Sequence, residues 1–132
     1  MLLLDTDVIS HLFRETAAPE VVAALRRYPM GERVTSAITV GEITYGFEKS
    51  GAGDARRELM ERHFLCRLQI LPFDEAAARM YGKVRADLER RNHSLHGPDL
   101  RIAAIALSRD LVLATGNRRH YERVTGLRLL DW

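Results

Sequence analysis

Two kinds of hydrophobic pattern alternate along this chain. Short apolar or alternating runs, which are typical of strands, lie at residues 2–4, 34–38, 67–71, 111–114 and 127–130. Between them, apolar residues recur at three- and four-residue steps, a spacing that predicts helices. The expected helices cover residues 7–13, 19–25, 39–49 and 54–64, a long segment after Asp74, and a segment from Pro98 to Leu107. The last strand, 127–130, could form an edge of a sheet.

The order of these elements determines the fold class that we expect. Strands separated by helices predict a parallel sheet with helices on both faces. The helix from Pro98 is apolar on nearly all sides and is expected to be buried. The chain has 132 residues and no linker or internal repeat, so residues 1–132 are expected to form a single domain. The expected architecture is an α/β three-layer sandwich of about five strands.

Composition narrows the cellular setting. Cys66 is the only cysteine, so no internal disulfide can form and a cytoplasmic location is expected. No apolar run approaches the roughly 18 residues of a membrane helix, and the start has no signal-peptide pattern. The net charge is +2, and Lys49 and Lys83 are the only lysines. The many arginines suit a phosphate-rich ligand or an acidic partner, and equally a biased genome with solvated helix faces.

An acidic residue follows the first strand directly. Asp5 comes after the apolar run 2–4, and a charge so close to a core is costly unless it is paired or binds a metal. Asn117 likewise follows a strand, while Glu42 and Asp99 fall in the expected first turns of helices. In a parallel α/β sheet, carboxyl strand ends and helix N-termini share one edge, where ligands bind. The four side chains are therefore expected to lie close together.

Most of these polar residues also have a structural explanation. Thr39 and Glu42 have the spacing of a capping box, and Asp99 in a first helical turn would interact favourably with the helix dipole. The other polar residues at element boundaries are expected to be helix caps or turn residues: Asp7, Asp54, Asp74 and Asn117. Spacing alone does not decide between these roles and a shared site.

Three carboxylates in one pocket would repel each other. At 4 Å and an effective dielectric constant of ~20, each pair costs about 4 kcal/mol, so a proton or a divalent cation must relieve the repulsion. The ligands would be oxygen atoms, and the five histidines (11, 63, 93, 96 and 120) show no zinc-type spacing. This favours Mg²⁺, with Mn²⁺ as a substitute, over Zn²⁺.

Five sequence motifs, in order, resemble one known family. They are LDTDVIS at residues 4–10, SAITVGEITYG at 36–46, GPDLRIAA at 97–104, LATGN at 113–117, and YERVTGL at 121–127 with DW at 131–132. Across its whole length the chain resembles PIN-domain ribonucleases, specifically the VapC toxins of bacterial VapBC toxin–antitoxin pairs. The resemblance implies a PIN-like five-stranded parallel sheet, Mg²⁺-dependent hydrolysis of RNA (such as tRNA), a homodimer, and inhibition by a VapB-like antitoxin.

Site residues follow from this resemblance position by position. Asp5, Glu42 and Asp99 match the family's three metal-binding acids. Asn117 stands where many members have a fourth acid and many VapC chains have asparagine. Two threonines match positions that often steady the acids or a bound water: Thr6 and Thr115.

Two further expectations concern the substrate and the antitoxin. Backbone phosphates are expected to be held by Arg14, Arg118 and Arg119. The antitoxin is expected to insert an arginine among the carboxylates, because such charge-assisted pairs are strong. Its apolar stretch should dock beside four side chains of the first expected helix: Val8, Ile9, Leu12 and Phe13.

Two other functions fit parts of the sequence. The opening LDTDV also fits haloacid-dehalogenase-like phosphatases, in which Asp5 would be a nucleophile and Asp7 an acid or base. Such enzymes also need a later lysine and an acid pair after a strand, and no acid pair follows strand 111–114. A PIN-like module that binds RNA or an antitoxin without cleaving RNA is the other alternative.

Overall fold

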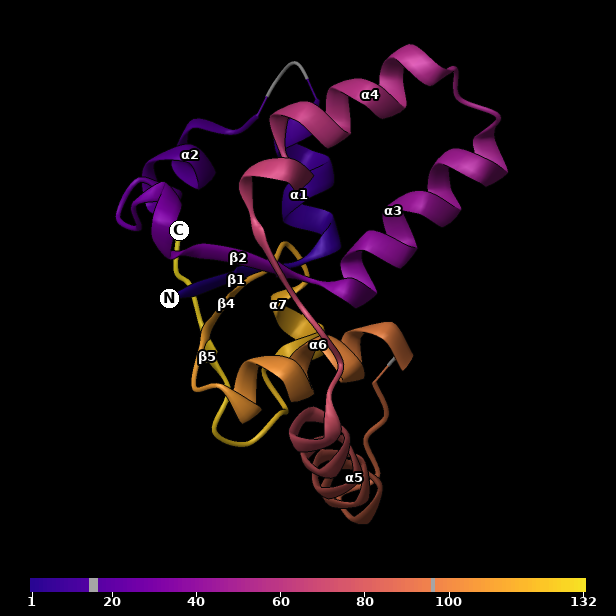
Figure 1. The fold of residues 1–132 in the computed structure, drawn as a ribbon. Helices are drawn as coiled ribbons and strands as arrows, with labels where there is room; N and C mark the ends of the chain where they lie inside the picture. The colour runs from indigo at the N-terminus through magenta and orange to yellow at the C-terminus, as the bar shows by residue number, and fades with distance from the viewer. Residues whose placement is uncertain (15–16, 96) are drawn as a thin grey trace.

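Five short strands form one parallel sheet (Figure 1). The computed structural model describes residues 1–14, 17–95 and 97–132. The strands are β1 (Leu2–Leu4), β2 (Arg33–Ser36), β3 (Gln69–Leu71), β4 (Val112–Ala114) and β5 (Arg128–Leu129). Their order in the sheet is β3-β2-β1-β4-β5. The parallel pairing, the strand number and the edge position of the last strand are as predicted.

Helices cover both faces of the sheet (Figure 1). One face carries α1 (Thr6–Phe13), α2 (Pro19–Leu25), α3 (Ala37–Ser50) and α4 (Asp54–His63), and the other carries α5 (Glu75–Arg90) and α6 (Gly97–Ser108). The short α7 (Arg118–Tyr121) follows β4, and 3₁₀ turns occupy Met30–Glu32 and Leu65–Arg67. This three-layer α/β sandwich confirms the predicted fold class. Within the described residues, no helix has both the length and the apolar character needed to cross a membrane.

The core follows from the alternation of side chains along the strands. In β1, Leu3 packs with the core under α5 and α6, whereas Leu2 and Leu4 pack with the core under α1–α4. The prediction that the helix from Pro98 is buried is also confirmed, because residues 102–106 of α6 are almost fully buried. Since β1 lies at the centre of the sheet and is covered on both faces, the residue that follows it starts from a fixed position.

The start of α3 differs from the prediction. β2 ends at Ser36 and α3 begins at Ala37, so Ile38 lies in the helix rather than in the strand. The Ser36 side chain accepts a hydrogen bond from the Thr39 N–H at 3.1 Å and is the N-cap. The predicted capping box of Thr39 and Glu42 is therefore wrong, because an earlier hydroxyl already satisfies the first turn. Glu42 lies in the second turn of α3, not the first, and its carboxylate is available for another role.

Other element boundaries also differ in part from the prediction. Asp74 caps α5 as predicted, accepting a hydrogen bond from the Ala77 N–H at 3.0 Å. Asp54, in contrast, is the first residue of α4, and Gly53 is the N-cap without a side-chain hydrogen bond. β3 begins only at Gln69, because a 3₁₀ turn occupies the residues before it. The sequence does not predict α7, which is too short to give a periodic pattern.

Candidate active site

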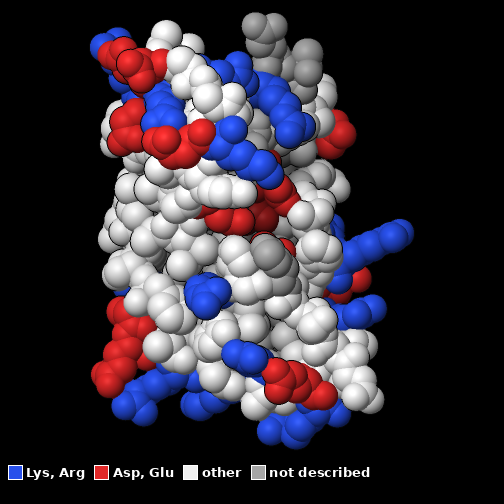
Figure 2. Space-filling view, turned by 90° about the vertical axis from the view of Figure 1, so that its right-hand side faces the viewer, with Lys and Arg blue, Asp and Glu red and all other residues white. Residues whose placement is uncertain are grey.

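A cavity of about 240 Å³ lies at the carboxyl edge of the sheet, beyond the ends of β1 and β4. Figure 2 looks onto this edge, where acidic side chains gather in a recess. The lining residues are Asp5, Thr6, Asp7, Glu42, Asp99, Asn117 and His120. The structure thus brings the four predicted site residues and Thr6 together in one cavity. Thr115 does not line it but is buried beside Asp5.

Asp5 is the buried member of this set, with only 3% of the residue exposed. Its side chain accepts a hydrogen bond from the Val8 N–H at 2.9 Å. Asp5 is therefore the N-cap of α1, a role that the sequence suggested for Asp7. The Asp5 N–H donates to the Ala114 carbonyl of β4 at 3.1 Å. These bonds fix the carboxylate at the centre of the sheet edge.

Burial raises the pKa of Asp5 to about 7. Hydrogen bonds from Thr115 and Val8 favour the charged form and oppose this rise, whereas the negative charges of Asp7 and Asp99 add to it. Near neutral pH, the Asp5 carboxyl is therefore divided between its two protonation states. A cation in the cavity would favour the charged form and lower the pKa again.

Glu42 and Asp99 are each held by one neighbour. The Thr6 hydroxyl donates to Glu42 Oε1 at 2.5 Å, which joins the start of α1 to α3. Asp99 Oδ2 lies 3.2 Å from His120 Nδ1, and the Asp99 side chain is 18% exposed. Glu42 comes from the second turn of α3 and Asp99 from the first turn of α6. The carboxylates therefore approach the cavity from separate elements, and each is oriented by a partner.

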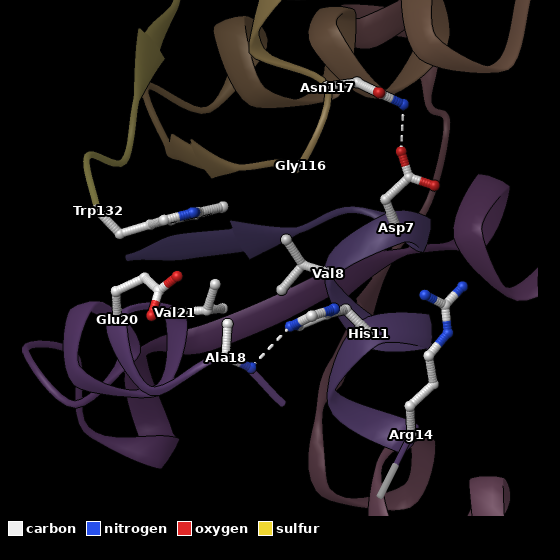
Figure 3. Close-up of a pocket in the computed structure, with 10 residues that line it drawn as sticks. All are labelled: Asp7, Val8, His11, Arg14, Ala18, Glu20, Val21, Gly116, Asn117 and Trp132. Carbon is white, nitrogen blue, oxygen red and sulfur yellow. Dashed lines mark hydrogen bonds between the residues drawn. The ribbon is translucent and has the colours of Figure 1, made fainter. Parts of the chain in front are cut away.

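Three exposed residues, Asp7, Asn117 and His120, form the outer rim of the cavity. The Asn117 side-chain amide donates a hydrogen bond to Asp7 (Figure 3), and the Asn117 N–H donates to Thr115 Oγ1 at 3.0 Å. The sequence-based site did not include Asp7 or His120. Asp7 could have been found from its position two residues after Asp5. His120 lies in α7, for which the sequence gives no signal.

The donor set of the cavity fits a hard divalent cation. Oxygen-bearing side chains predominate, and no lysine or arginine is found among the described residues that line it. As they stand, no three His, Cys, Asp or Glu side chains in the described ranges are close enough together to hold an ion. Joint binding of one ion by Asp5, Glu42 and Asp99 would require these side chains to approach one another.

A tyrosine hydroxyl lies behind these acids. Tyr121 in α7 is 1% exposed, and its hydroxyl makes no hydrogen bond of regular geometry to any described residue. Burial raises the pKa of Tyr121, and the negative charges of Asp99 and Asp5 raise it further. Tyr121 therefore stays neutral beside the carboxylates. The sequence-based site did not include it.

Comparisons with known proteins converge on one family. The PIN domain family matches residues 2–127. A tRNA(fMet)-specific endonuclease VapC from Shigella flexneri is 35% identical over 130 residues, which cover 98% of this chain and 96% of that protein. The structure of DNA-bound VapBC from Salmonella typhimurium matches with a TM-score of 0.88 and 33% identity, over 99% of this chain and 97% of that chain. FitAcB from Neisseria gonorrhoeae matches with a TM-score of 0.85 and 31% identity, over 99% and 97% respectively.

Proposed function

Since this chain belongs to the PIN-domain family and, within it, to the VapC ribonucleases, we propose that it is the endoribonuclease toxin of a toxin–antitoxin pair. The observation that carries this proposal is the convergence of Asp5, Glu42 and Asp99 on one cavity at the carboxyl edge of the sheet. PIN-domain nucleases generally depend on a divalent metal, and the oxygen donors favour Mg²⁺, with Mn²⁺ as a substitute. We further propose that residues 1–132 fold as one PIN domain, and that the protein works in the cytoplasm as a homodimer.

The acids share the work of holding the ion and activating water. Asp5, Glu42 and Asp99 supply the carboxylate ligands, and the Thr6 hydroxyl orients Glu42. When bound, the ion offsets charge on the phosphate oxygens and makes a nearby water more acidic. A carboxylate of this set that is not fully engaged accepts the proton of the attacking water. Because water attacks phosphorus, the RNA 2′-hydroxyl is not required, and the products carry 5′-phosphate and 3′-hydroxyl ends.

Arginines near the cavity hold the RNA backbone. Arg14 and Arg119 are exposed, and Lys and Arg side chains lie close to the acidic recess in Figure 2. Arg118 pairs instead with Asp131 at 3.1 Å and donates to the Leu130 carbonyl at 2.8 Å. We therefore assign the phosphate contacts to Arg14 and Arg119 rather than to all three expected arginines. The substrate class is tRNA, by analogy with the Shigella relative.

A groove next to the cavity suits the antitoxin. Val8 and Ile9, which we expected to contact it, are 2% and 0% exposed and belong to the core. A groove of about 280 Å³ lies instead between α1, α3 and α4, and it shares Thr6 and Glu42 with the acidic cavity. Its apolar side chains are Phe13, Ile43, Phe47 and Met60. An apolar helix of the antitoxin docks in this groove and extends an arginine to the carboxylates.

The test compares the purified chain with Asp5→Asn, Asp99→Asn and Asp54→Asn on tRNA. Asp54 is exposed at the start of α4, outside the cavity, so its variant changes one charge without touching the site. Wild type and Asp54→Asn should cleave in Mg²⁺ and stop in EDTA, whereas Asp5→Asn and Asp99→Asn should not cleave. Sequencing of the fragments should find 5′-phosphate ends. Cleavage in excess EDTA, or by both site variants, contradicts the proposal, and an inactive wild type would point to a non-cleaving module.

A further inference from the structure

We propose that a second cavity beside the acids binds an unpaired nucleobase of the RNA, with Trp132 as its stacking surface. The base belongs to the nucleotide next to the phosphate that is cut. This inference rests on the proposed ribonuclease function and adds a recognition site to it.

The second cavity has a volume of about 460 Å³, which is within the range of about 300–1,000 Å³ for small-ligand sites. Asp7 and Asn117 line both cavities, and the hydrogen bond between their side chains forms the shared wall (Figure 3). An RNA strand with its reacting phosphate beside Asp5 therefore carries its next nucleotide across this wall. The base of that nucleotide is then placed at the second cavity.

The lining suits a nucleotide whose base enters the cavity. Arg14 also lines it and is the residue assigned to a backbone phosphate, whereas the carboxylates of Asp7 and Glu20 can accept hydrogen bonds from base N–H groups. Val8 and Val21, although largely buried in the core, also line the cavity and lie between the two carboxylates. Trp132 extends into the cavity from the opposite side, and its flat indole is the kind of surface on which unpaired bases stack (Figure 3).

Trp132 is held in place by the segment before it. The Leu130 N–H donates to β4 at 2.8 Å, Asp131 pairs with Arg118 at 3.1 Å, and Arg27 donates to the Asp131 carbonyl. Trp132 is nevertheless 39% exposed, so part of the indole is free to meet a ligand. An aromatic side chain that is both anchored and exposed loses little conformational entropy on binding.

The opposite wall is also preformed. His11 Nε2 accepts a hydrogen bond from the Ala18 N–H at 2.9 Å, which ties α1 to the residue that caps α2 (Figure 3). In its neutral form, the His11 ring therefore carries its proton on Nδ1. With both walls fixed, the cavity can discriminate between bases by shape and by hydrogen bonding, instead of folding around any base that arrives.

Cleavage of single-stranded RNA of random sequence tests this proposal. Trp132→Leu keeps an apolar side chain without an aromatic face, and Trp132→Phe keeps such a face. Tyr45→Leu is the matched control, because Tyr45 is an exposed aromatic residue of α3 outside both cavities. Wild type, Trp132→Phe and Tyr45→Leu should share a base preference at one position beside the cut, and Trp132→Leu should lose it. The same preference in all four proteins overturns the proposal.

Fluorescence gives a second test that does not depend on cleavage, because Trp132 is the only tryptophan. An oligoribonucleotide should quench Trp132 in the Asp5→Asn variant, and an abasic nucleotide beside the cleavage position should relieve the quenching. Loss of stacking in Trp132→Leu should weaken RNA binding roughly 5- to 100-fold.

Two outcomes of the fluorescence test overturn the nucleobase site. The first is RNA binding that leaves Trp132 fluorescence unchanged, and the second is quenching by an antitoxin peptide but not by RNA. If wild type cuts neither tRNA nor the random RNA, the ribonuclease function fails. Quenching of Trp132 by an oligoribonucleotide then tests the nucleobase site separately, because it does not require cleavage.

Discussion

The inner wall of the acidic cavity, formed by Asp5 with Thr115 buried beside it, differs in kind from the outer rim, formed by Asp7, Asn117 and His120. The inner wall is buried and is tied to the main chain of α1 and β4. The rim is exposed, and its side-chain hydrogen bonds can rearrange when a ligand binds. We infer that the inner wall sets the position of the metal ion, and that burial of the Asp5 carboxyl lowers the free energy of unfolding. The rim, in contrast, adapts to the substrate.

The largest difference in RNA cleavage rate is expected between Asp5→Asn and Asp7→Asn. Asparagine at position 5 keeps the shape and the capping bond but removes the central charge. Mutation of a residue that only supports a metal ligand already lowers activity about 10- to 100-fold. RNA cleavage by Asp5→Asn should therefore fall more than roughly 100-fold. Asp7→Asn removes a charge from the rim and should reduce cleavage by no more than the roughly 10- to 100-fold of an outer-shell partner. Single-turnover cleavage in saturating Mg²⁺ measures both. A larger loss in Asp7→Asn would reverse the roles of wall and rim.

The free energy of unfolding should fall as pH rises, because the buried Asp5 carboxyl of the inner wall becomes charged. Asp5 has a pKa of about 7 in the folded protein against an ordinary value of 3.8, so the folded state binds more protons between these pH values. Its contribution to the free energy of unfolding should therefore decline across that window by up to about 4 kcal/mol and stay level above it. Urea unfolding in EDTA measures this. In Asp5→Asn the decline should be absent, and an identical pH dependence in both proteins would refute the role of the buried charge.

A negative charge added to the rim should change stability less than the charge of Asp5 does. Asn117→Asp removes the hydrogen bond to Asp7 and adds a carboxylate to the cavity. The apo protein should lose about 1 kcal/mol of stability through repulsion, and the Mg²⁺ concentration for half-maximal cleavage should fall several-fold. A Mg²⁺ titration of the cleavage rate measures this shift. A higher Mg²⁺ requirement would mean that position 117 does not face the ion.

The smallest change in the free energy of unfolding is expected for a substitution at Tyr121. Tyr121→Phe removes a buried hydroxyl that has no regular hydrogen bond among the described residues, so the free energy of unfolding should change by less than about 1 kcal/mol. Thermal unfolding of the two proteins measures the difference. A loss of more than about 2 kcal/mol would show that the hydroxyl supports Asp99 through a hydrogen bond in solution.

Much of the fold can be predicted from the sequence because the strands are short, apolar and separated by periodic helices. The convergence of Asp5, Glu42 and Asp99 also follows, since a parallel sheet gathers strand ends and helix starts at one edge. Helix caps are harder to place, because Ser36 and Thr39 carry equivalent hydroxyl groups in one short stretch. Only the position where the strand ends decides which of them caps α3.

The surroundings of the site depend on tertiary packing, which the sequence does not give. Val8 and Ile9 form an apolar run in a short helix, and nothing in that run shows that both face the core. His120 enters the cavity only because one helical turn after Asn117 directs it there. The pairing of Trp132 with the second cavity joins opposite ends of the chain, so no local pattern predicts it.

Mn²⁺ binding by the RNA-free protein most directly tests whether the acids form a metal site. Calorimetric titration should be done on wild type, Asp5→Asn and the matched control Asp54→Asn at the same pH. We predict equal binding by wild type and Asp54→Asn, and at least roughly 10-fold weaker binding by Asp5→Asn. Equal Mn²⁺ affinity in all three proteins would contradict a metal site among Asp5, Glu42 and Asp99.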